Sequence, residues 1–287
     1  MRLADPLDQA SGLRRLFAPE PAFQSLGVLG PDARRTARAC AAIGLSMGRR
    51  GHRVMVMDET RAPHNVAGLL GILPRYSLAD APSRGLVSVV QQAPDGLVLL
   101  AAQDGLNILA GLSEHNLLDM AEAWQVRADR PEWLMLNGGD GPLRCHGLAA
   151  TASLRVLVIP GNRAALADAY AVMKSVHTAW SGNNWLVLVD GAEEGQALGL
   201  FTSLSETAQR FLGVTPSFLG CIARETPGTQ PAVLDAVLVD SLSEAGSRQT
   251  ETERINFEQY WQRMWLYSRT TAEAATKKVQ NGWRNAG

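Results

Sequence analysis

The sequence predicts an α/β domain with a mostly parallel sheet of about seven strands, flanked by helices. Two observations lead to this prediction. Short, mainly apolar runs recur along the chain, and helix-like stretches separate them. The runs are continuously apolar rather than alternating in polarity, which is typical of strands buried on both faces of a sheet. Regular alternation of strand and helix favours parallel strands joined by crossover helices.

The expected strands, in chain order, cover residues 24–29, 53–57, 97–101, 133–136, 154–159, 185–189 and 218–222. The expected helices between them include residues 33–49, 114–125, 163–178 and 198–212. Gly51 follows the first of these helices, as a helix-ending glycine often does. We therefore expect three parts: a mobile segment at 1–23, the α/β domain at 24–240 and a helical tail at 241–287.

Composition excludes several classes of protein. The 287 residues are enough to bury a full core, and the formal net charge of −1 argues against a nucleic-acid binder. The longest apolar run, residues 97–102, is six residues long, whereas a membrane-spanning helix needs about 20. The three cysteines form no CxxC pair, which predicts no metal site and fits a reducing cytoplasm. We therefore expect a cytoplasmic protein.

The first expected strand leads into a loop that has the order of a phosphate-binding loop but not its chemistry. Such a loop needs glycine N–H groups to wrap the phosphates and a lysine to neutralise them. Residues 29–36 read LGPDARRT, in which Pro31 has no N–H and Asp32 carries a negative charge. The chain contains three lysines, and none precedes Lys174. The usual phosphate-binding loop is therefore excluded.

Three segments of the expected scaffold read RAPHNVAGLLGILPRYSLADA, LVIPGNRAALADAYAVMK and RFLGVTPSFLGCIARE. With these segments, residues from about 5 to 240 resemble the MinD/ParA family of deviant phosphate-loop ATPases and, within it, the flagellar-number regulators FlhG, also called FleN. The resemblance implies the phosphate-loop NTPase fold of MinD/ParA proteins. It also implies an adenine-contacting asparagine near residues 189–191, where this chain has none.

The family's loop GKGGVGKT, aligned without gaps on Thr36, covers residues 29–36. Its signature lysine then falls on Gly30, its last glycine on Arg34 and its phosphate lysine on Arg35. An arginine fork does not replace a compact ammonium in a tight loop. The loop thus keeps the family's threonine and loses both lysines.

The acidic positions of the family are also altered. The first aspartate after the second strand is kept as Asp58, but the second falls on Thr60, and the Walker B aspartate falls on Asn137. We interpret the chain as a pseudo-ATPase without a cofactor, and the alternative is an ATPase that binds ATP with magnesium. The vestigial nucleotide site would consist of Gly30, Arg34, Arg35, Thr36, Asp58, Thr60 and Asn137.

Residues 8–14 read DQASGLR and resemble the N-terminal DQAxxLR segment of FlhG proteins. The resemblance implies a short helix that docks on FlhF, a signal-recognition-type GTPase, and stimulates its hydrolysis. Gly12 weakens a helix by roughly 1 kcal/mol, so we expect the segment to fold on its partner. The expected contact residues are Asp8, Gln9, Ala10, Leu13 and Arg14.

Residues 252–269 predict an amphipathic helix with an aromatic stripe. Its large apolar residues recur at helical spacing, and they include Phe257, Trp261, Met264 and Trp265. One interpretation is contact with a membrane surface or a partner, since large rings beside arginines suit an interface. The other is packing on the domain itself or on a second subunit. The sequence leaves both open.

The function expected from these observations is control of flagellar number or placement by protein–protein contact. The expected partner is an FlhF-like GTPase. A second possibility is an anti-activator that binds a flagellar transcription activator, and a third is a MinD/ParA-type ATPase. A homodimer and peripheral contact with the inner membrane are further alternatives that the sequence does not decide.

Overall fold

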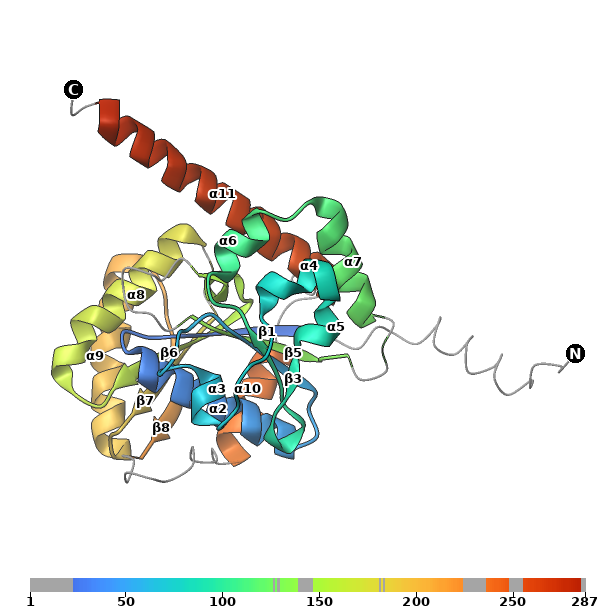
Figure 1. The fold of residues 1–287 in the computed structure, drawn as a ribbon. Helices are drawn as coiled ribbons and strands as arrows, with labels where there is room; N and C mark the ends of the chain where they lie inside the picture. The colour runs from blue at the N-terminus through green and yellow to red at the C-terminus, as the bar shows by residue number, and fades with distance from the viewer. Residues whose placement is uncertain are drawn as a thin grey trace, which may run out of the picture.

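The computed structural model describes residues 23–125, 127, 130–138, 147–180, 182, 184–223, 236–247 and 255–284. In this part the chain forms one eight-stranded sheet with the strand order β3-β4-β2-β5-β1-β6-β7-β8 (Figure 1). All pairs are parallel except β3 with β4. The α/β fold with a mostly parallel sheet is therefore confirmed.

The strands are β1 (Gln24–Leu29), β2 (Val54–Asp58), β3 (Gln91–Gln92), β4 (Val98–Ala101), β5 (Trp133–Asn137), β6 (Leu154–Pro160), β7 (Trp185–Asp190) and β8 (Ser217–Ile222). All seven expected strands are present within one or two residues of the expected bounds. The added strand, β3, is two glutamines at the sheet edge, and a polar pair of this kind gives no apolar run to predict it.

The α-helices are α2 (Ala33–Arg49), α3 (Val66–Leu69), α4 (Ala81–Arg84), α5 (Leu86–Val89), α6 (Gly105–Ala110), α7 (Glu114–Gln125), α8 (Leu166–Ala179), α9 (Glu194–Leu212), α10 (Ala236–Ser247) and α11 (Phe257–Arg284). The short 3-10 helices are η1 (Leu78–Asp80), η2 (Pro94–Gly96), η3 (Leu148–Thr151) and η4 (Arg163–Ala165). The bounds of α2 and α7 match those expected from the sequence.

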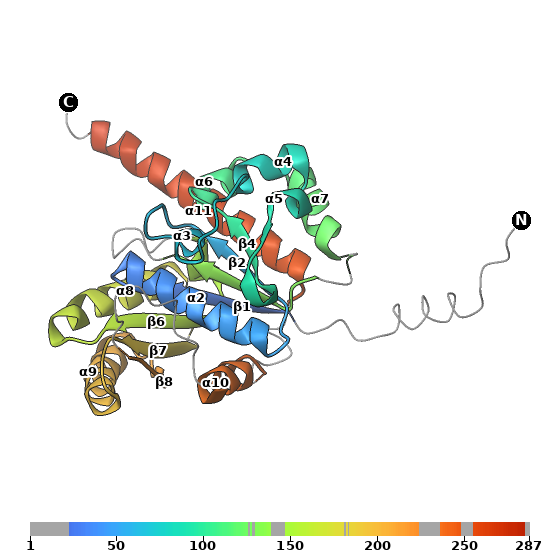
Figure 2. The same ribbon diagram turned by 60° about the horizontal axis from the view of Figure 1, so that its bottom comes forward.

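Helices cover both faces of the sheet. Helices α2, α3 and α10 pack on one face, and α4 to α9 with α11 pack on the other (Figures 1 and 2). Alternation along the strands sends neighbouring side chains into opposite layers. In β2, for example, Val56 belongs to the α2 layer, whereas Met55 and Met57 belong to the α11 layer.

Helix α2 connects the sheet to the candidate site. Its residues from Thr36 to Met47 are buried, and many of them are small. A Cβ on Gly44 would lie 3.0 Å from a methyl of Leu97, so this small residue lets the helix approach its neighbours closely. Asp32 caps the helix, and Gly51 follows it with a φ of +85°. The packing fixes the amino end of α2 at the carboxyl end of β1.

The C-terminal helix corrects one expectation. The aromatic stripe is part of the α11-side core rather than a surface for membrane or partner: Phe257, Trp261, Met264 and Trp265 are all less than 9% exposed. They pack with Phe23 and with α6, α7 and η3. A helical period shows that one face is apolar but not what covers it, so the sequence could not separate the two interpretations.

Specific contacts hold α11 in place. Trp265 Nε1 donates to the Leu112 carbonyl at 3.0 Å, and the Tyr260 hydroxyl lies 2.9 Å from Thr151 Oγ1. The rings of Phe23 and Phe257 meet edge to face at 5.3 Å. One core therefore extends across the domain boundaries that were expected at 23/24 and 240/241. The helix also runs further than 252–269, and its C-terminal half projects from the domain (Figure 1).

None of the helices in the described ranges has both the length and the apolar character needed to cross a membrane.

Candidate functional site

The candidate site lies at the carboxyl edge of the sheet, where ligands bind in open parallel α/β folds. The pairing register of the strands determines which residues lie side by side at this edge. Asp58 ends β2 and pairs with Asn137 at the end of β5, and Pro160 of β6 pairs with Asp190 at the end of β7. The expected vestigial residues lie along one edge, where Arg35 belongs to one cluster of contacts and Asp58, Thr60 and Asn137 belong to another.

The loop between β1 and α2 is closed by its own groups. The Asp32 carboxylate accepts a hydrogen bond from the Arg35 N–H at 3.1 Å, and the Asp32 carbonyl accepts one from Thr36 Oγ1 at 2.8 Å. A helix N-terminus attracts anions, and here the anion is the chain's own Asp32. Thr36 is fully buried. A Cβ on Gly30 would lie 2.6 Å from Thr36 Oγ1, so packing itself requires this glycine.

The first cluster is a charged clamp formed by Arg35, Arg38 and Asp190. Arg35 Nη1 donates to Asp190 Oδ2 at 2.6 Å and to the Asp190 carbonyl at 3.1 Å. Arg38 Nη1 lies 3.0 Å from Asp190 Oδ1, and Arg38 Nη2 donates to the Ala223 carbonyl. Asp190 is fully buried, so two cations neutralise one buried carboxylate. The residue at the phosphate-lysine position therefore ties α2 to β7.

Sequence reasoning missed the clamp partners Arg38 and Asp190. A signal for Arg38 existed, because it lies three residues after Arg35 and so shares a helix face with it. No local signal marks the partner on β7, since 155 residues separate Arg35 from Asp190. Arg34, the third basic residue of this turn, is exposed. It points to solvent rather than joining the clamp.

The second cluster joins Asp58, Thr60 and Asn137, all at most 1% exposed. Asp58 Oδ1 accepts hydrogen bonds from Thr60 Oγ1 at 2.5 Å, Thr60 N at 3.1 Å and Asn137 Nδ2 at 2.8 Å. Asp58 Oδ2 accepts one from Val66 N at 2.6 Å. The Asp58 carboxylate thus has four donors from its own chain.

Two effects on the pKa of Asp58 oppose each other in this cluster. Burial raises the pKa of Asp58 above its ordinary value, and the four hydrogen bonds from Thr60, Asn137 and Val66 lower it in part. Asn137 Oδ1 is buried and has no hydrogen-bond partner among the residues described. An asparagine at this position satisfies Asp58 by donating, whereas a second carboxylate would repel it.

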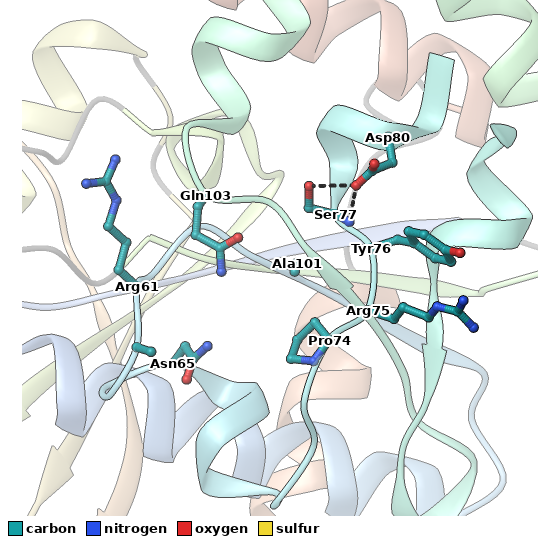
Figure 3. A pocket seen from close by; sticks show the side chains of 10 residues that line it. Arg61, Asn65, Pro74, Arg75, Tyr76, Ser77, Asp80, Ala101 and Gln103 are labelled. Carbon is teal, nitrogen blue, oxygen red and sulfur yellow. Dashed lines mark hydrogen bonds between the residues drawn. The ribbon is translucent and has the colours of Figure 1, made fainter. Parts of the chain in front are cut away.

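A cavity of about 300 Å³ lies beside this cluster, over the carboxyl ends of β2 and β4 (Figure 3). Gln103 links the two, because its Nε2 donates to the Thr60 carbonyl at 3.3 Å. The sequence did not predict this cavity. Its lining comes from three separate segments: Arg61, Ala62 and Asn65 after β2, residues 74–77 with Asp80, and Ala101 with Gln103.

Other residues that the sequence singled out do not belong to this site. The docking residues Asp8, Gln9, Ala10, Leu13 and Arg14 lie outside the described residues, as does the segment from 139 to 146. Within the described ranges, no group of three or more histidine, cysteine or acidic side chains is arranged to hold a metal ion.

Comparison with known proteins agrees with this architecture. The chain is 26% identical over 204 residues to the antiactivator FleN of Pseudomonas aeruginosa, covering 68% of the chain and 72% of that protein. No family model matches the chain.

Solved structures show the same fold. A chain of the MinC:MinD cell division protein complex of Aquifex aeolicus matches with a TM-score of 0.56 and 15% identity, over 80% of this chain and 98% of that chain. A ParA family ATPase from Chlorobium tepidum matches with a TM-score of 0.54 and 13% identity, over 79% and 100%. The chain therefore shares its fold with MinD and ParA proteins, and its sequence is similar to that of the antiactivator FleN.

Proposed function

We propose that this chain is a regulator of flagellar number or placement that acts by protein–protein contact and is a pseudo-ATPase. The observation that carries the proposal is the clamp: the arginine at the phosphate-lysine position is bonded to Asp190 instead of facing a phosphate. The relationship to the antiactivator FleN supports the regulatory part of the proposal. The internal bonding of the loop and of Asp58 supports the pseudo-ATPase part.

The residues present do not fit a magnesium-bound nucleotide. Pro31 cannot donate an N–H, and the Asp32 carboxylate occupies the start of α2, where a phosphate would need to lie. The Thr36 hydroxyl is buried, and it donates its hydrogen to the Asp32 carbonyl within the loop. Asp58 accepts four hydrogen bonds within the protein. A magnesium ion would have to displace these donors, each at a cost of about 1 kcal/mol or more.

Two partners are proposed, each from a different observation. The DQASGLR segment at 8–14 favours an FlhF-like GTPase, because a short glutamine-containing helix offered in trans can orient groups at a partner's phosphate site. The similarity to a protein named as an antiactivator favours a flagellar transcription activator. Contact through a scaffold that needs no nucleotide is compatible with either partner.

Calorimetric titration of the full chain with magnesium-ATP tests the pseudo-ATPase. We expect no binding up to about 1 mM, the level that corresponds to roughly 4 kcal/mol. A tighter dissociation constant would overturn this part of the proposal and favour a weak ATPase.

A GTPase assay tests the partner. Purified FlhF-like GTPase is mixed with the full chain, with its Gln9→Ala variant, and with a synthetic peptide of residues 1–23. We expect stimulation by the full chain and by the peptide, and loss of stimulation with Gln9→Ala. If the full chain neither binds nor stimulates the GTPase, the transcription activator is left as the proposed partner.

A further inference from the structure

We propose that the segment before β1 docks on its own domain, with the Phe17 ring in a small cavity at the amino edge of the sheet, where the strands begin. The cavity measures about 110 Å³. Protein cavities of roughly 150 Å³ hold a single benzene ring, so this one has the size for one aromatic side chain. The proposal rests on the proposed function in one respect, that residues 8–14 dock on a partner.

The walls of the cavity are mainly apolar. They come from the starts of β2 and β4, from the end of α7 and from the segment before β5. The apolar residues are Val54, Met55, Val98, Trp124 and Pro131. The remaining lining residues are Arg53, Gln92 and Gly96, of which the last two are exposed. The cavity therefore opens to solvent on the side of β3, and an apolar side chain suits its walls.

The polar groups of the lining favour a peptide segment over a charged ligand. Arg53 is already neutralised, because its Nη2 lies 2.6 Å from Glu132 Oε1 and its Nε donates to the Arg130 carbonyl at 2.8 Å. Trp124 is 3% exposed, and its indole N–H has no hydrogen-bond partner among the described residues. A buried indole N–H usually has an acceptor. A docked segment brings backbone carbonyl oxygens of the kind that this wall lacks.

Hydrogen bonds place the start of β1 close to the cavity. Gln24 N donates to the Glu132 carbonyl at 2.8 Å, and Glu132 N donates to the carbonyl of Arg53, a lining residue, at 2.8 Å. The pairing register agrees, because Gln24 pairs with Trp133 and Trp133 pairs with Val54, another lining residue. Two strand spacings separate β1 from β2 and three separate it from β4, which correspond to about 10 and 14 Å. The segment that ends at β1 thus starts its course beside the cavity.

The sequence before β1 has the length to reach the cavity. Residues 16–23 read LFAPEPAF. Pro19 and Pro21 restrict their own φ and disfavour a helical conformation of the residue before each, so the sequence favours an extended course. At about 3.1 Å per residue, the chain from Phe23 back to Phe17 spans about 19 Å. This length exceeds the separation of β1 from β2 and β4, so a Phe17 ring can enter the cavity.

Docking of Phe17 has a consequence for the proposed partner contact. Phe17 lies three residues after Arg14, the last residue of the segment at 8–14. A docked Phe17 therefore holds this segment against its own domain, and a partner has to compete with the cavity for it. The free chain accordingly stimulates a partner GTPase less than a chain whose cavity is blocked.

Limited trypsin digestion of the full chain tests the docking, with early fragments identified by mass spectrometry. Trypsin cleaves after Arg14 and Arg15, and its rate there follows the fraction of chains in which the segment is released from the domain. We expect Phe17→Ser to speed cleavage at these two sites by about tenfold, because a serine does not gain from burial in the cavity. Gln92→Trp should give a similar increase, because it offers the cavity another ring at its exposed side.

Two controls match these changes. Ser217→Trp introduces the same ring at an exposed residue at the start of β8, the strand at the opposite end of the sheet, and it should leave the rate unchanged. Synthetic peptides of residues 1–23 with phenylalanine or serine at position 17 should be cleaved at equal rates, which separates docking from the preference of the protease. Gln92 and Ser217 are both exposed, so circular dichroism should show folded protein for both variants.

Three outcomes overturn the proposal. The first is cleavage of the full chain as fast as the free peptide, which would show that the segment is not held. The second is an equal increase with Ser217→Trp, which would show that the cavity is not involved. The third is cleavage that slows as the protein concentration rises, which would show that a second copy receives the segment.

The GTPase assay separates this proposal from the proposed function. Gln92→Trp leaves residues 1–23 intact, so it should increase stimulation of the FlhF-like GTPase when the chain is limiting. If no form of the chain stimulates the GTPase, the proposed partner fails, and the protease result still decides whether Phe17 docks. If the wild-type chain stimulates the GTPase and its segment is cleaved as fast as the free peptide, only the docking fails.

Discussion

Arg35 and Asp190 form a direct ion pair, with Arg35 Nη1 2.6 Å from Asp190 Oδ2, between the amino end of α2 and the carboxyl end of β7. The resemblance to MinD/ParA proteins led us to expect phosphate and base contacts near these two places. In this chain the two residues are bonded to each other, and the ion pair cross-links α2 and β7.

Replacement of Arg35 by lysine tests whether one residue could restore the loop. Arg35→Lys returns an ammonium to the position, but Pro31 and Asp32 still oppose phosphate binding. We expect no magnesium-ATP binding by calorimetry. We also expect a loss of about 1 kcal/mol in the free energy of unfolding, because a single ammonium cannot keep both the Nη1 contacts with Asp190 and the Nε contact with Asp32 at 3.5 Å. Arg34→Lys, at the exposed neighbour, is the control and should change neither quantity. Binding tighter than about 1 mM would contradict the prediction.

The clamp also predicts the effect of removing its anion. Asp190→Asn keeps the size of the side chain and leaves Arg38, 8% exposed, without its charged partner. We expect a loss of about 2–4 kcal/mol in urea unfolding, below the full value for a buried pair because Arg35 is partly in solvent.

The control for this change is an exposed ion pair, Arg50 with Asp240, in which the Asp240 side chain is 61% exposed. Asp240→Asn should cost about 0–1 kcal/mol. Equal losses from Asp190→Asn and Asp240→Asn would show that the clamp does not hold α2 to β7.

The raised pKa of Asp58 predicts that the stability of the fold depends on pH. Burial raises its pKa above 3.8 in the folded protein, so the fold favours the protonated form. The contribution of Asp58 to stability is therefore full below 3.8 and declines as the pH rises through its folded-state pKa. An asparagine does not titrate. The destabilisation caused by Asp58→Asn should accordingly be larger near pH 4.5 than near pH 7, measured by urea unfolding at both values.

Thr60→Val provides an internal comparison for this prediction. It removes the hydroxyl that donates to Asp58 Oδ1 at 2.5 Å and that helps to lower the pKa of Asp58. The pKa should rise further, and the decline of stability with pH should extend to higher pH. Identical effects of Asp58→Asn at both pH values would show that Asp58 titrates alike in the folded and unfolded chain.

The buried stripe on α11 makes the helix part of the domain's stability. Trp261 is fully buried, so Trp261→Ala should cost about 3–5 kcal/mol in urea unfolding. Leu266 lies on the same helix and is 57% exposed, and Leu266→Ala should change stability by about 0.5 kcal/mol or less. Truncation after residue 250 should expose the core and cause aggregation. A truncated chain that folds and stays monomeric would contradict the burial of the stripe.

The sequence by itself predicted the framework because the framework depends on local patterns. Seven apolar runs marked the seven parallel strands, and Gly51 marked the end of α2. The elements that it did not predict lack such patterns. Strand β3 is two glutamines held by its neighbour β4, and α3, α4 and α5 are four residues each, too short to show a helical period.

For the candidate site too, the sequence predicted some features and the tertiary structure decided the others. Chain order and composition were sufficient to find the altered loop and to exclude a phosphate lysine, because these are statements about which residues are present. The sequence did not reveal where Arg35 points, because its partner Asp190 is 155 residues away and is brought near by the pairing of β6 with β7. The aromatic stripe likewise has the same period whether lipid, a partner or η3 covers it. Long-range register and packing decided both, since they set which groups share a buried space.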